Sequence, residues 1–289
     1  MEALSPAAIV GAAVILGGVG FFFAAFIAIA NRKFHVWEDP RIDVVAGFLP
    51  GANCGACGQP GCRAFAEQTV AGVIAPARCS VASADVRAEI AEYLGVDVGQ
   101  AIRRVARLFC AGGSDVAPDR VDYQGLPTCK AAAAVCGGHK ACAWGCLGLG
   151  DCARACTFDA IWMNDVGLPV VVAEKCTACG DCVRACPKDL FAVMPMDHKL
   201  LVQCRSLLEG EAAERLCRVA CNGCGKCVVD AAPGVIEIKN GLAVIDYSRN
   251  DLATPAATLR CPTGAIVWVE AGELSAAGAS RRFAPEVSA

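Results

Sequence analysis

The chain has 289 residues, with 26 Lys and Arg against 29 Asp and Glu, so its formal net charge is −3. This balance excludes the broad basic surface that binding to DNA or RNA requires, and no nucleic-acid partner is expected. The chain contains 21 cysteines and 30 glycines but only 6% aromatic residues, a composition that favours small units built around inorganic centres over one large apolar core.

The first element is an apolar run from Leu4 to Ala30 that contains no charged residue. It exceeds the roughly 20 residues that a helix needs to span a bilayer, so a single transmembrane helix is expected within residues 1–33. A cleaved signal peptide is the alternative, but its apolar core is usually only about 7–15 residues long. Arg32 and Lys33 follow the run, and the positive-inside rule then places the remaining chain in the cytoplasm.

The second element, residues 34–95, contains a glycine-rich motif with the cysteine spacing C-x2-C-x4-C-x16-C. Its expected cluster ligands are Cys54, Cys57, Cys62 and Cys79. Glycines between the cysteines allow backbone amides to approach a cluster, which favours a [4Fe–4S] centre. Tetrahedral zinc also suits four cysteines, but the ferredoxin-like motifs farther along the chain argue for iron. An amphipathic helix is predicted over 84–94.

A connecting segment at 96–140 precedes a predicted two-cluster ferredoxin domain at 141–200. Cys176, Cys179, Cys182 and Cys186, followed by Pro187, match the bacterial ferredoxin signature, in which the fourth cysteine ligates the other cluster. The preceding half is a variant, because Leu149 occupies its middle position, and Cys142 is the expected substitute ligand. The predicted sets are therefore Cys142, Cys146, Cys152 and Cys186 for one cluster, and Cys156, Cys176, Cys179 and Cys182 for another. Segments 160–163 and 168–172 predict a β-hairpin between the two halves.

Residues 201–270 predict a degenerate second repeat with one cluster, and residues 271–289 a flexible tail. The expected ligands are Cys221, Cys224, Cys227 and Cys261. The positions that would have served a sister cluster are all non-cysteine: Ala231, Asp251, Thr254 and Ala257. Because these four positions belong to one cluster, we interpret the pattern as the loss of that cluster. A hairpin is expected around Asn240-Gly241.

Five cysteines belong to none of these sets: Cys110, Cys129, Cys136, Cys204 and Cys217. Buried free thiols are the default interpretation. Cys217 precedes Cys221 with the spacing that separates Cys142 from Cys146, so it is also a candidate alternative ligand. An additional cluster, or a pair formed with Cys129, is left open by the sequence.

The order of these elements resembles the B subunit of the Rnf complex, an ion-translocating ferredoxin:NAD oxidoreductase of bacterial inner membranes. The distinctive stretches are residues 51–58 with Cys62 and Cys79, and residues 142–152. Thr157 departs from the proline that the family usually has there. The resemblance implies an α+β fold with one transmembrane helix, a four-cysteine iron–sulfur module and bacterial ferredoxin-like repeats.

The resemblance also implies a function. The chain would accept electrons from soluble ferredoxin and relay them to membrane and flavin-bearing subunits, anchored in lipid by a single pass with its four [4Fe–4S] clusters on the cytoplasmic side. As part of a translocase of the EC 7 type it would need no independent catalytic site. The alternatives are a membrane-anchored polyferredoxin of another redox complex, an enzyme that uses one cluster catalytically, and a zinc-stabilised scaffold.

Overall fold

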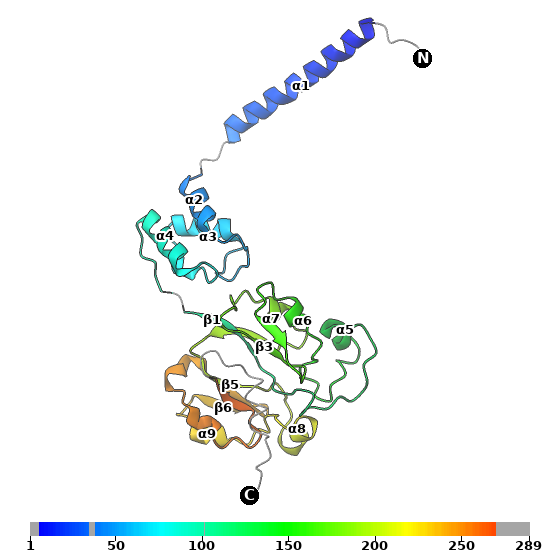
Figure 1. Ribbon diagram of the computed structural model, residues 1–289, viewed down its shortest axis with the longest axis vertical. Coiled ribbons are helices and arrows are strands. Elements are labelled where there is room, and N and C mark those ends of the chain that lie inside the picture. The colour runs from blue at the N-terminus through cyan, green and yellow to red at the C-terminus, as the bar shows by residue number, and fades with distance from the viewer. Residues whose placement is uncertain (1–5, 35–37, 101, 270–289) are drawn as a thin grey trace.

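The computed structural model describes residues 6–34, 38–100 and 102–269. Figure 1 shows three successive parts, namely a long N-terminal helix, a small helical module and a larger body made of short strands and helices. The mixed helix and strand content agrees with the α+β class predicted from the sequence. The predicted tail at 271–289 lies outside the described residues.

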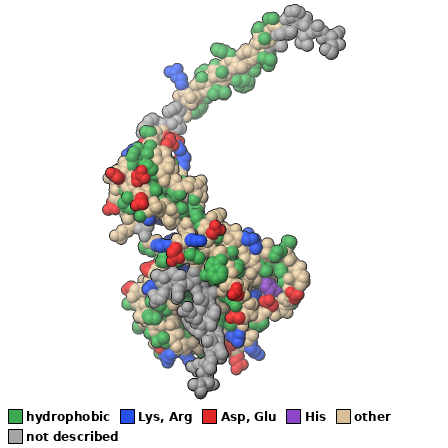
Figure 2. Space-filling model, in the orientation of Figure 1, with side chains coloured by type: hydrophobic (Ala, Val, Ile, Leu, Met, Phe, Trp, Pro, Cys, Tyr) green, Lys and Arg blue, Asp and Glu red, His purple; other side chains and the backbone are tan. Residues whose placement is uncertain are grey.

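Helix α1, Pro6–Phe34, stands apart from the rest of the chain. Its segment Ala13–Phe34 is long and apolar enough to cross a membrane, and none of it is buried inside the protein. Hydrophobic side chains lie along much of its length in Figure 2. An apolar helix without intramolecular partners needs a nonaqueous environment, which fits a membrane-associated chain. The helix continues past Ala30 and includes Arg32 and Lys33 in its last turn.

The module that follows is helical. It contains α2 (Arg41–Phe48), α3 (Cys62–Val70), the short 3-10 helix η1 (Pro76–Arg78) and α4 (Ala84–Leu94). The helix predicted over 84–94 is confirmed at both ends. The Ser83 hydroxyl accepts a hydrogen bond from the Val86 N–H at 3.2 Å, and Gly95 ends the helix in the left-handed conformation. Val45, Phe65 and Ile90 form the buried centre of the module.

The first ferredoxin-like repeat begins with strand β1 and ends with strand β4. In chain order it contains β1 (Arg104–Leu108), α5 (Cys129–Ala134), α6 (Asp151–Arg154), β2 (Ile161–Met163), β3 (Pro169–Val171), α7 (Asp181–Ala185) and β4 (Phe191–Pro195). Strands β2 and β3 form the predicted hairpin, with Met163 opposite Pro169. Strand β1 pairs antiparallel with β4, although it lies within the segment expected to be a connection.

The second repeat has the same plan. It contains β5 (Leu200–Val202), α8 (Gly210–Leu216), α9 (Lys226–Asp230), β6 (Ile236–Lys239), β7 (Leu242–Ile245), the 3-10 helices η2 (Tyr247–Leu252) and η3 (Pro255–Thr258), and β8 (Ile266–Trp268). Strands β6 and β7 form the expected hairpin, and β5 pairs antiparallel with β8. Asn240 and Gly241 both have positive φ, as a tight hairpin turn requires.

From Cys142 to Cys186 the first repeat corresponds to the second at an offset of 75 positions, apart from a one-residue shift in the hairpin turn that pairs Gly167 with Gly241. Cys146 and Cys152 in the first repeat become Cys221 and Cys227 in the second. The close approach of the cluster loop to the hairpin also recurs. A Cβ on Gly148 would lie 2.9 Å from the Gly167 carbonyl oxygen, and one on Gly223 would lie 3.0 Å from the Gly241 carbonyl oxygen. The repeats are therefore two copies of one unit.

Candidate metal centres

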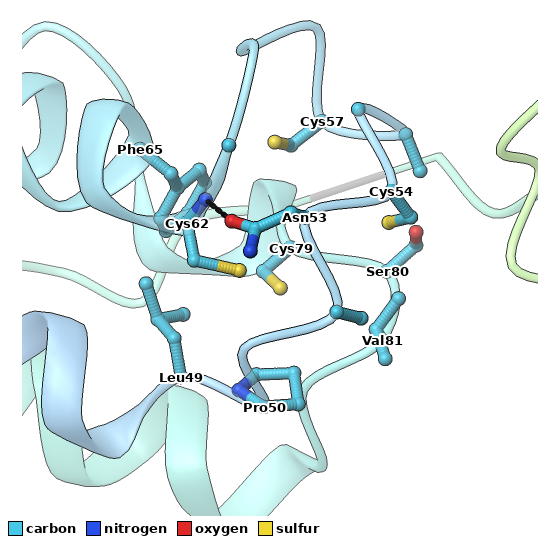
Figure 3. A pocket seen from close by; sticks show the side chains of 14 residues that line it. Leu49, Pro50, Asn53, Cys54, Cys57, Cys62, Phe65, Cys79, Ser80 and Val81 are labelled. Atoms are coloured by element: carbon cyan, nitrogen blue, oxygen red, sulfur yellow. Dashed lines mark hydrogen bonds between the residues drawn. The ribbon is translucent and has the colours of Figure 1, made fainter.

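A cavity of about 340 Å³ in the first module is lined by the four cysteines of the glycine-rich motif. Figure 3 shows the sulfurs of Cys54, Cys57, Cys62 and Cys79 directed toward the same space. Cys62 begins α3, and Cys79 directly follows η1, so two short helices and a loop position the set. We call it site 1.

The loop of site 1 is fixed by the Asn53 side chain. Its Oδ1 accepts a hydrogen bond from the Cys62 N–H at 2.8 Å, and its Nδ2 donates to the Gly51 carbonyl oxygen at 3.1 Å. A Cβ on Gly61 would lie 2.9 Å from Oδ1, so only glycine leaves room for this contact. Asn53 thereby ties the cysteine loop to the start of α3 and satisfies an amide that the helix leaves unpaired.

Site 3, in the first repeat, is a cavity of about 300 Å³ lined by Cys156, Cys176, Cys179 and Cys182. Three of these cysteines come from the loop before α7 and its first turn, and Cys156 reaches over from the end of α6. The Cys156 sulfur accepts a hydrogen bond from the Ala160 N–H at 3.4 Å. The structure thus brings together the set that the crossed ferredoxin signature predicts.

Site 4, in the second repeat, is a cavity of about 330 Å³ lined by Cys221, Cys224, Cys227 and Cys261. Cys227 lies in α9, and Cys261 follows η3. The predicted set again meets at one cavity.

Site 2 differs from the prediction. Its cavity of about 360 Å³ is lined by Cys146, Cys152 and Cys186 as expected, but the fourth cysteine is Cys129 and not Cys142. The physical reason is an insertion in the first repeat that carries α5, with Cys129 at its first position. The insertion delivers a thiol to the place where the ferredoxin signature has its middle cysteine and this chain has Leu149.

Two hydrogen bonds hold Cys129 at site 2. The Thr128 hydroxyl caps α5 by accepting from the Ala131 N–H at 3.2 Å, and Asp151 Oδ2 accepts from the Lys130 N–H at 3.0 Å. The pKa of the neighbouring Cys152 thiol is raised to about 12, chiefly by burial and to a smaller extent by the charges of Cys129 and Cys186. The sequence signal for Cys129 is the capping Thr128, which marks a helix start but says nothing about what that helix approaches.

Two of the four positions assigned to the missing sister cluster, Ala231 and Ala257, pack in the apolar core of the second repeat, whereas Asp251 and Thr254 are exposed. Ala257 is buried, and Ala231, Ala232 and Ala253 pack against the same hydrophobic cluster. Helix α9 and η3 are neighbours there. Small side chains let two short helices close over the space that corresponds to site 3 of the first repeat, which agrees with the interpretation of a lost cluster.

The four sites have the ligand chemistry of [4Fe–4S] clusters. Each presents four thiols around one cavity. Among the described residues no three Cys, His, Asp or Glu side chains converge closely enough to hold a single metal ion. Spacing around a void favours a group with four separate irons over one tetrahedral zinc.

Sites 1, 3 and 2 are also linked to one another. The Ser80 hydroxyl, next to Cys79 of site 1, donates a hydrogen bond at 2.7 Å to the carbonyl oxygen of Thr177, which follows Cys176 of site 3. Sites 3 and 2 share one repeat, in which α6 and α7 pack together. The structure therefore places three of the four cavities in succession from the helical module into the first repeat.

Two family models match segments of the chain. A family described as "Putative Fe-S cluster" matches residues 49–81, which contain all of site 1. A family described as "4Fe-4S binding domain" matches residues 169–190, which contain three cysteines of site 3 and Cys186 of site 2. Both matches support iron–sulfur clusters as the cofactors.

Curated relatives cover most of the chain. The B subunit of the Na(+)-translocating ferredoxin:NAD(+) oxidoreductase complex of Acetobacterium woodii is 43% identical over 81% of this chain and 71% of its own length. The B subunit of the ion-translocating oxidoreductase complex of Methanosarcina acetivorans is 37% identical over 87% of this chain and 95% of its own. The B subunit of the proton-translocating ferredoxin:NAD(+) oxidoreductase complex of Clostridium ljungdahlii is 36% identical over 90% and 92%.

Proposed function

The chain belongs to the family of B subunits of ion-translocating oxidoreductase complexes, and we propose that it conducts electrons between ferredoxin and the membrane subunits of such a complex. The observation that carries this proposal is the succession of cysteine-lined cavities along one chain. When bound, a [4Fe–4S] cluster accepts and releases one electron at a time. Four such clusters are proposed, one at each site.

The proposed ligands follow the cavities. They are Cys54, Cys57, Cys62 and Cys79 at site 1; Cys129, Cys146, Cys152 and Cys186 at site 2; Cys156, Cys176, Cys179 and Cys182 at site 3; and Cys221, Cys224, Cys227 and Cys261 at site 4. Backbone amides next to the sites hydrogen-bond to sulfur, as the Leu190 N–H does to Cys186 at 3.5 Å. Such hydrogen bonds stabilise the reduced, more negative form of a cluster.

The two ends of the chain suit different partners. Site 1 lies in the module next to α1, so we propose that it faces the membrane subunits. Of the cysteines that line the four cavities, all within the described residues, Cys224 at site 4 is the exposed one. Electron transfer between proteins requires a centre near the surface, so we propose that soluble ferredoxin meets the second repeat.

We further propose that α1 crosses the inner membrane once, with Arg32 and Lys33 on the cytoplasmic side, and that its apolar surface packs against lipid and membrane subunits. From Pro6 to Ala30 the helix contains no ionisable side chain. A translocated ion would therefore need other subunits for its path. The relatives' names specify Na+ in one case and protons in another, so membership of the family does not determine the ion.

No independent catalytic site is proposed. Each cavity offers four thiols, so every iron of a cubane would have a protein ligand and none would be open to a substrate. The chain would act by binding and spacing the clusters and by docking its partners. NAD reduction would then take place on a flavin-bearing subunit.

The direct test is reduction of the anaerobically purified full chain by reduced ferredoxin. We expect rapid bleaching of the visible iron–sulfur absorption and the appearance of electron paramagnetic resonance signals of reduced [4Fe–4S] clusters. Metal analysis should find iron and no stoichiometric zinc. A chain that contains zinc in place of iron, or that ferredoxin cannot reduce, would contradict the proposed function.

A further inference from the structure

Four buried cysteines line none of the four cavities. Each has at most 9% of its surface exposed: Cys110, Cys142, Cys204 and Cys217. The remaining spare cysteine, Cys136, is exposed. The four buried residues are far apart in the sequence, so their relative positions have to be established from the contacts around them.

One loop, residues 110–118, brings the four together. It begins with Cys110, and its backbone hydrogen-bonds to a residue adjacent to each of the other three cysteines. The Ala111 N–H donates to the carbonyl oxygen of Gln203, which precedes Cys204, at 3.1 Å. Two further backbone bonds have the loop as acceptor: Arg218 N–H, next to Cys217, donates to Val116 O at 3.0 Å, and Ala141 N–H, next to Cys142, donates to Pro118 O at 3.0 Å. The loop therefore fixes all four positions at once.

The sulfur atoms lie close to one another. A Cβ on Gly112 would sit 3.1 Å from the Cys217 sulfur and 3.7 Å from the Cys110 sulfur, so these two sulfurs are separated by no more than the sum of those distances. The pKa of Cys217 is raised to about 12, chiefly by burial and to a smaller extent by the charges of Cys110, Cys204 and Cys142. These effects agree with the backbone contacts of the 110–118 loop, which group Cys217 with its three counterparts.

The arrangement has the symmetry of the repeats. Cys110 and Cys204 each stand two residues beyond the end of the first strand of their repeat, β1 or β5. Each sulfur accepts a hydrogen bond at 3.4 Å from the amide two residues farther on, Gly112 or Ser206. The two half-sites are therefore built in the same way.

Each sulfur also has an equivalent neighbour in the following cluster loop. The Cys146 N–H donates a hydrogen bond to the Cys110 sulfur at 3.4 Å, and the backbone amide of Cys221 lies close enough to the Cys204 sulfur to oppose the rise in the pKa of that thiol. Cys146 and Cys221 are equivalent residues of sites 2 and 4. Cys142 and Cys217, the other two members of the group, stand four positions before them. Each repeat thus contributes one cysteine after its first strand and one before its cluster loop.

We propose that Cys110, Cys142, Cys204 and Cys217 hold a fifth [4Fe–4S] cluster, shared between the two repeats. Four converging thiols with amide donors to sulfur are the ligands and surroundings that such a cluster uses. A single zinc ion does not fit, because no three metal-binding side chains among the described residues converge on one point. The buried Lys140 ammonium, bonded to the Ala117 carbonyl oxygen at 2.9 Å and paired with Asp119 at 3.4 Å, would offset part of the negative charge of the loaded site.

This site fills a gap in the succession of clusters. The second repeat has lost the sister cluster that would have been the neighbour of site 4, and alanines occupy its place. The proposed site contacts Cys146 of site 2 through the Cys110 sulfur, and it adjoins Cys221 of site 4, whose backbone influences the pKa of the Cys204 thiol. Electrons could then pass from one repeat to the other through the proposed fifth cluster, without the sister cluster that the second repeat has lost.

The first experiment needs no variant. Native mass spectrometry of the anaerobically reconstituted full chain in detergent, together with iron and sulfide analysis, counts the clusters. We expect five clusters and about twenty irons per chain, since each cluster contains four. Four clusters with about sixteen irons would overturn the fifth site and leave the proposed function standing. Fewer than four clusters, with or without a zinc ion in the chain, would count against both the fifth site and the proposed function.

The second experiment locates the site. The double variant Cys110→Ala with Cys217→Ala removes one ligand from each repeat and should lose one cluster, about four irons, while the other four clusters stay. Cys136→Ala, an exposed cysteine in the same insertion as Cys129, is the matched control and should keep five. A double variant that keeps all its iron would overturn the assignment. If the double variant does not fold, the cluster count of the unmodified chain still decides whether a fifth cluster exists.

Discussion

The two ferredoxin-like repeats share one plan but differ in their cysteine-lined cavities, of which the first repeat has two and the second has one. In the first repeat, helices α6 and α7 each present cysteines to two cavities, and Cys156 and Cys186 cross from one half to the other. In the second repeat the equivalent of Cys156 is Ala231, and only Cys261 makes the crossing. One half of the second repeat therefore has packed side chains where the first repeat has a cavity lined by four cysteines.

The second repeat shows which contacts can stabilise a small domain where a cysteine-lined site is absent. Metal binding supplies folding free energy, and its loss has to be compensated by other contacts. The second repeat packs Ala231, Ala232, Ala253 and Ala257 at the vacated place. It also has an ion pair that the first repeat lacks: Asp230 and Arg260 stand where the first repeat has Ala155 and Ala185.

The difference between the repeats can be tested by removing two cysteines from one site in each repeat. Cys224→Ala with Cys227→Ala, at site 4, should cost about four irons, because the packed half of the second repeat does not depend on that cluster. Cys179→Ala with Cys182→Ala, at site 3, should cost about eight irons. Cys182 of site 3 and Cys152 of site 2 pack in the same hydrophobic core, so the loss of site 3 should also disrupt site 2. Iron and sulfide analysis of the anaerobically purified variants measures both losses.

Equal losses in the two double variants would mean that the repeats do not differ in how they are stabilised. The matched control is Cys136→Ala, which removes an exposed cysteine that lines none of the four cavities and should leave the iron content unchanged. Circular dichroism of each variant shows whether the helices and strands outside the emptied site persist.

A smaller effect is expected from Cys129→Ala, which tests how the first repeat completes its ligand set. The second repeat takes three neighbouring ligands from one loop, whereas the first has Leu149 in the middle position and relies on α5. Without Cys129, site 2 keeps three thiolates, so we expect loss of about one iron and a three-iron cluster. Electron paramagnetic resonance of the oxidised protein detects that species. An unchanged spectrum and iron content in Cys129→Ala would exclude this residue as a ligand.

The sequence predicts local features of the fold well. Helix α4 can be located because Ser83 and Gly95 are a capping residue and a left-handed terminator, and the hairpins because their turn residues are specific. The cysteines of sites 1, 3 and 4 meet at one cavity each, as predicted, because three of them are closely spaced in one loop and the known cluster motifs supply the distant fourth. That they bind clusters stays a prediction.

What the sequence could not provide was contact between distant segments. Strand β1 has no partner nearby in the sequence, because it pairs with β4 more than 80 residues later, so local patterns indicate only a connection there. Cys129 reaches site 2 through an insertion whose path no local pattern describes. The group formed by Cys110, Cys142, Cys204 and Cys217 depends on the packing of two repeats, and the 110–118 loop that organises it has no recognisable motif.

The smallest expected effect concerns the ion pair that belongs to the second repeat alone. The Nε–H of Arg260 donates to both carboxylate oxygens of Asp230, at 3.0 and 2.8 Å. Asp230 ends α9 and Arg260 directly precedes Cys261, so the pair connects these two segments. Hydrogen bonding to Arg260 lowers the pKa of the Asp230 carboxyl. Both side chains are exposed to solvent in part, and surface pairs contribute little, so Asp230→Asn should lower the temperature of cluster loss by only on the order of one to two degrees.

The sign of its pH dependence follows from the lowered pKa. A carboxyl with a depressed pKa in the folded protein stabilises the fold above its unfolded pKa of about 3.9, and the contribution disappears as the pH falls through the folded value. The difference between Asp230→Asn and the unmodified chain should therefore be constant from about pH 6 to 8, where the carboxyl is ionised in both states. Because salt screens exposed charges, high ionic strength should reduce it. The temperature at which visible absorption is lost, measured at several pH values and salt concentrations, gives this difference between the two proteins. If the difference changes across neutral pH, a group other than Asp230 stabilises the alanine-packed half.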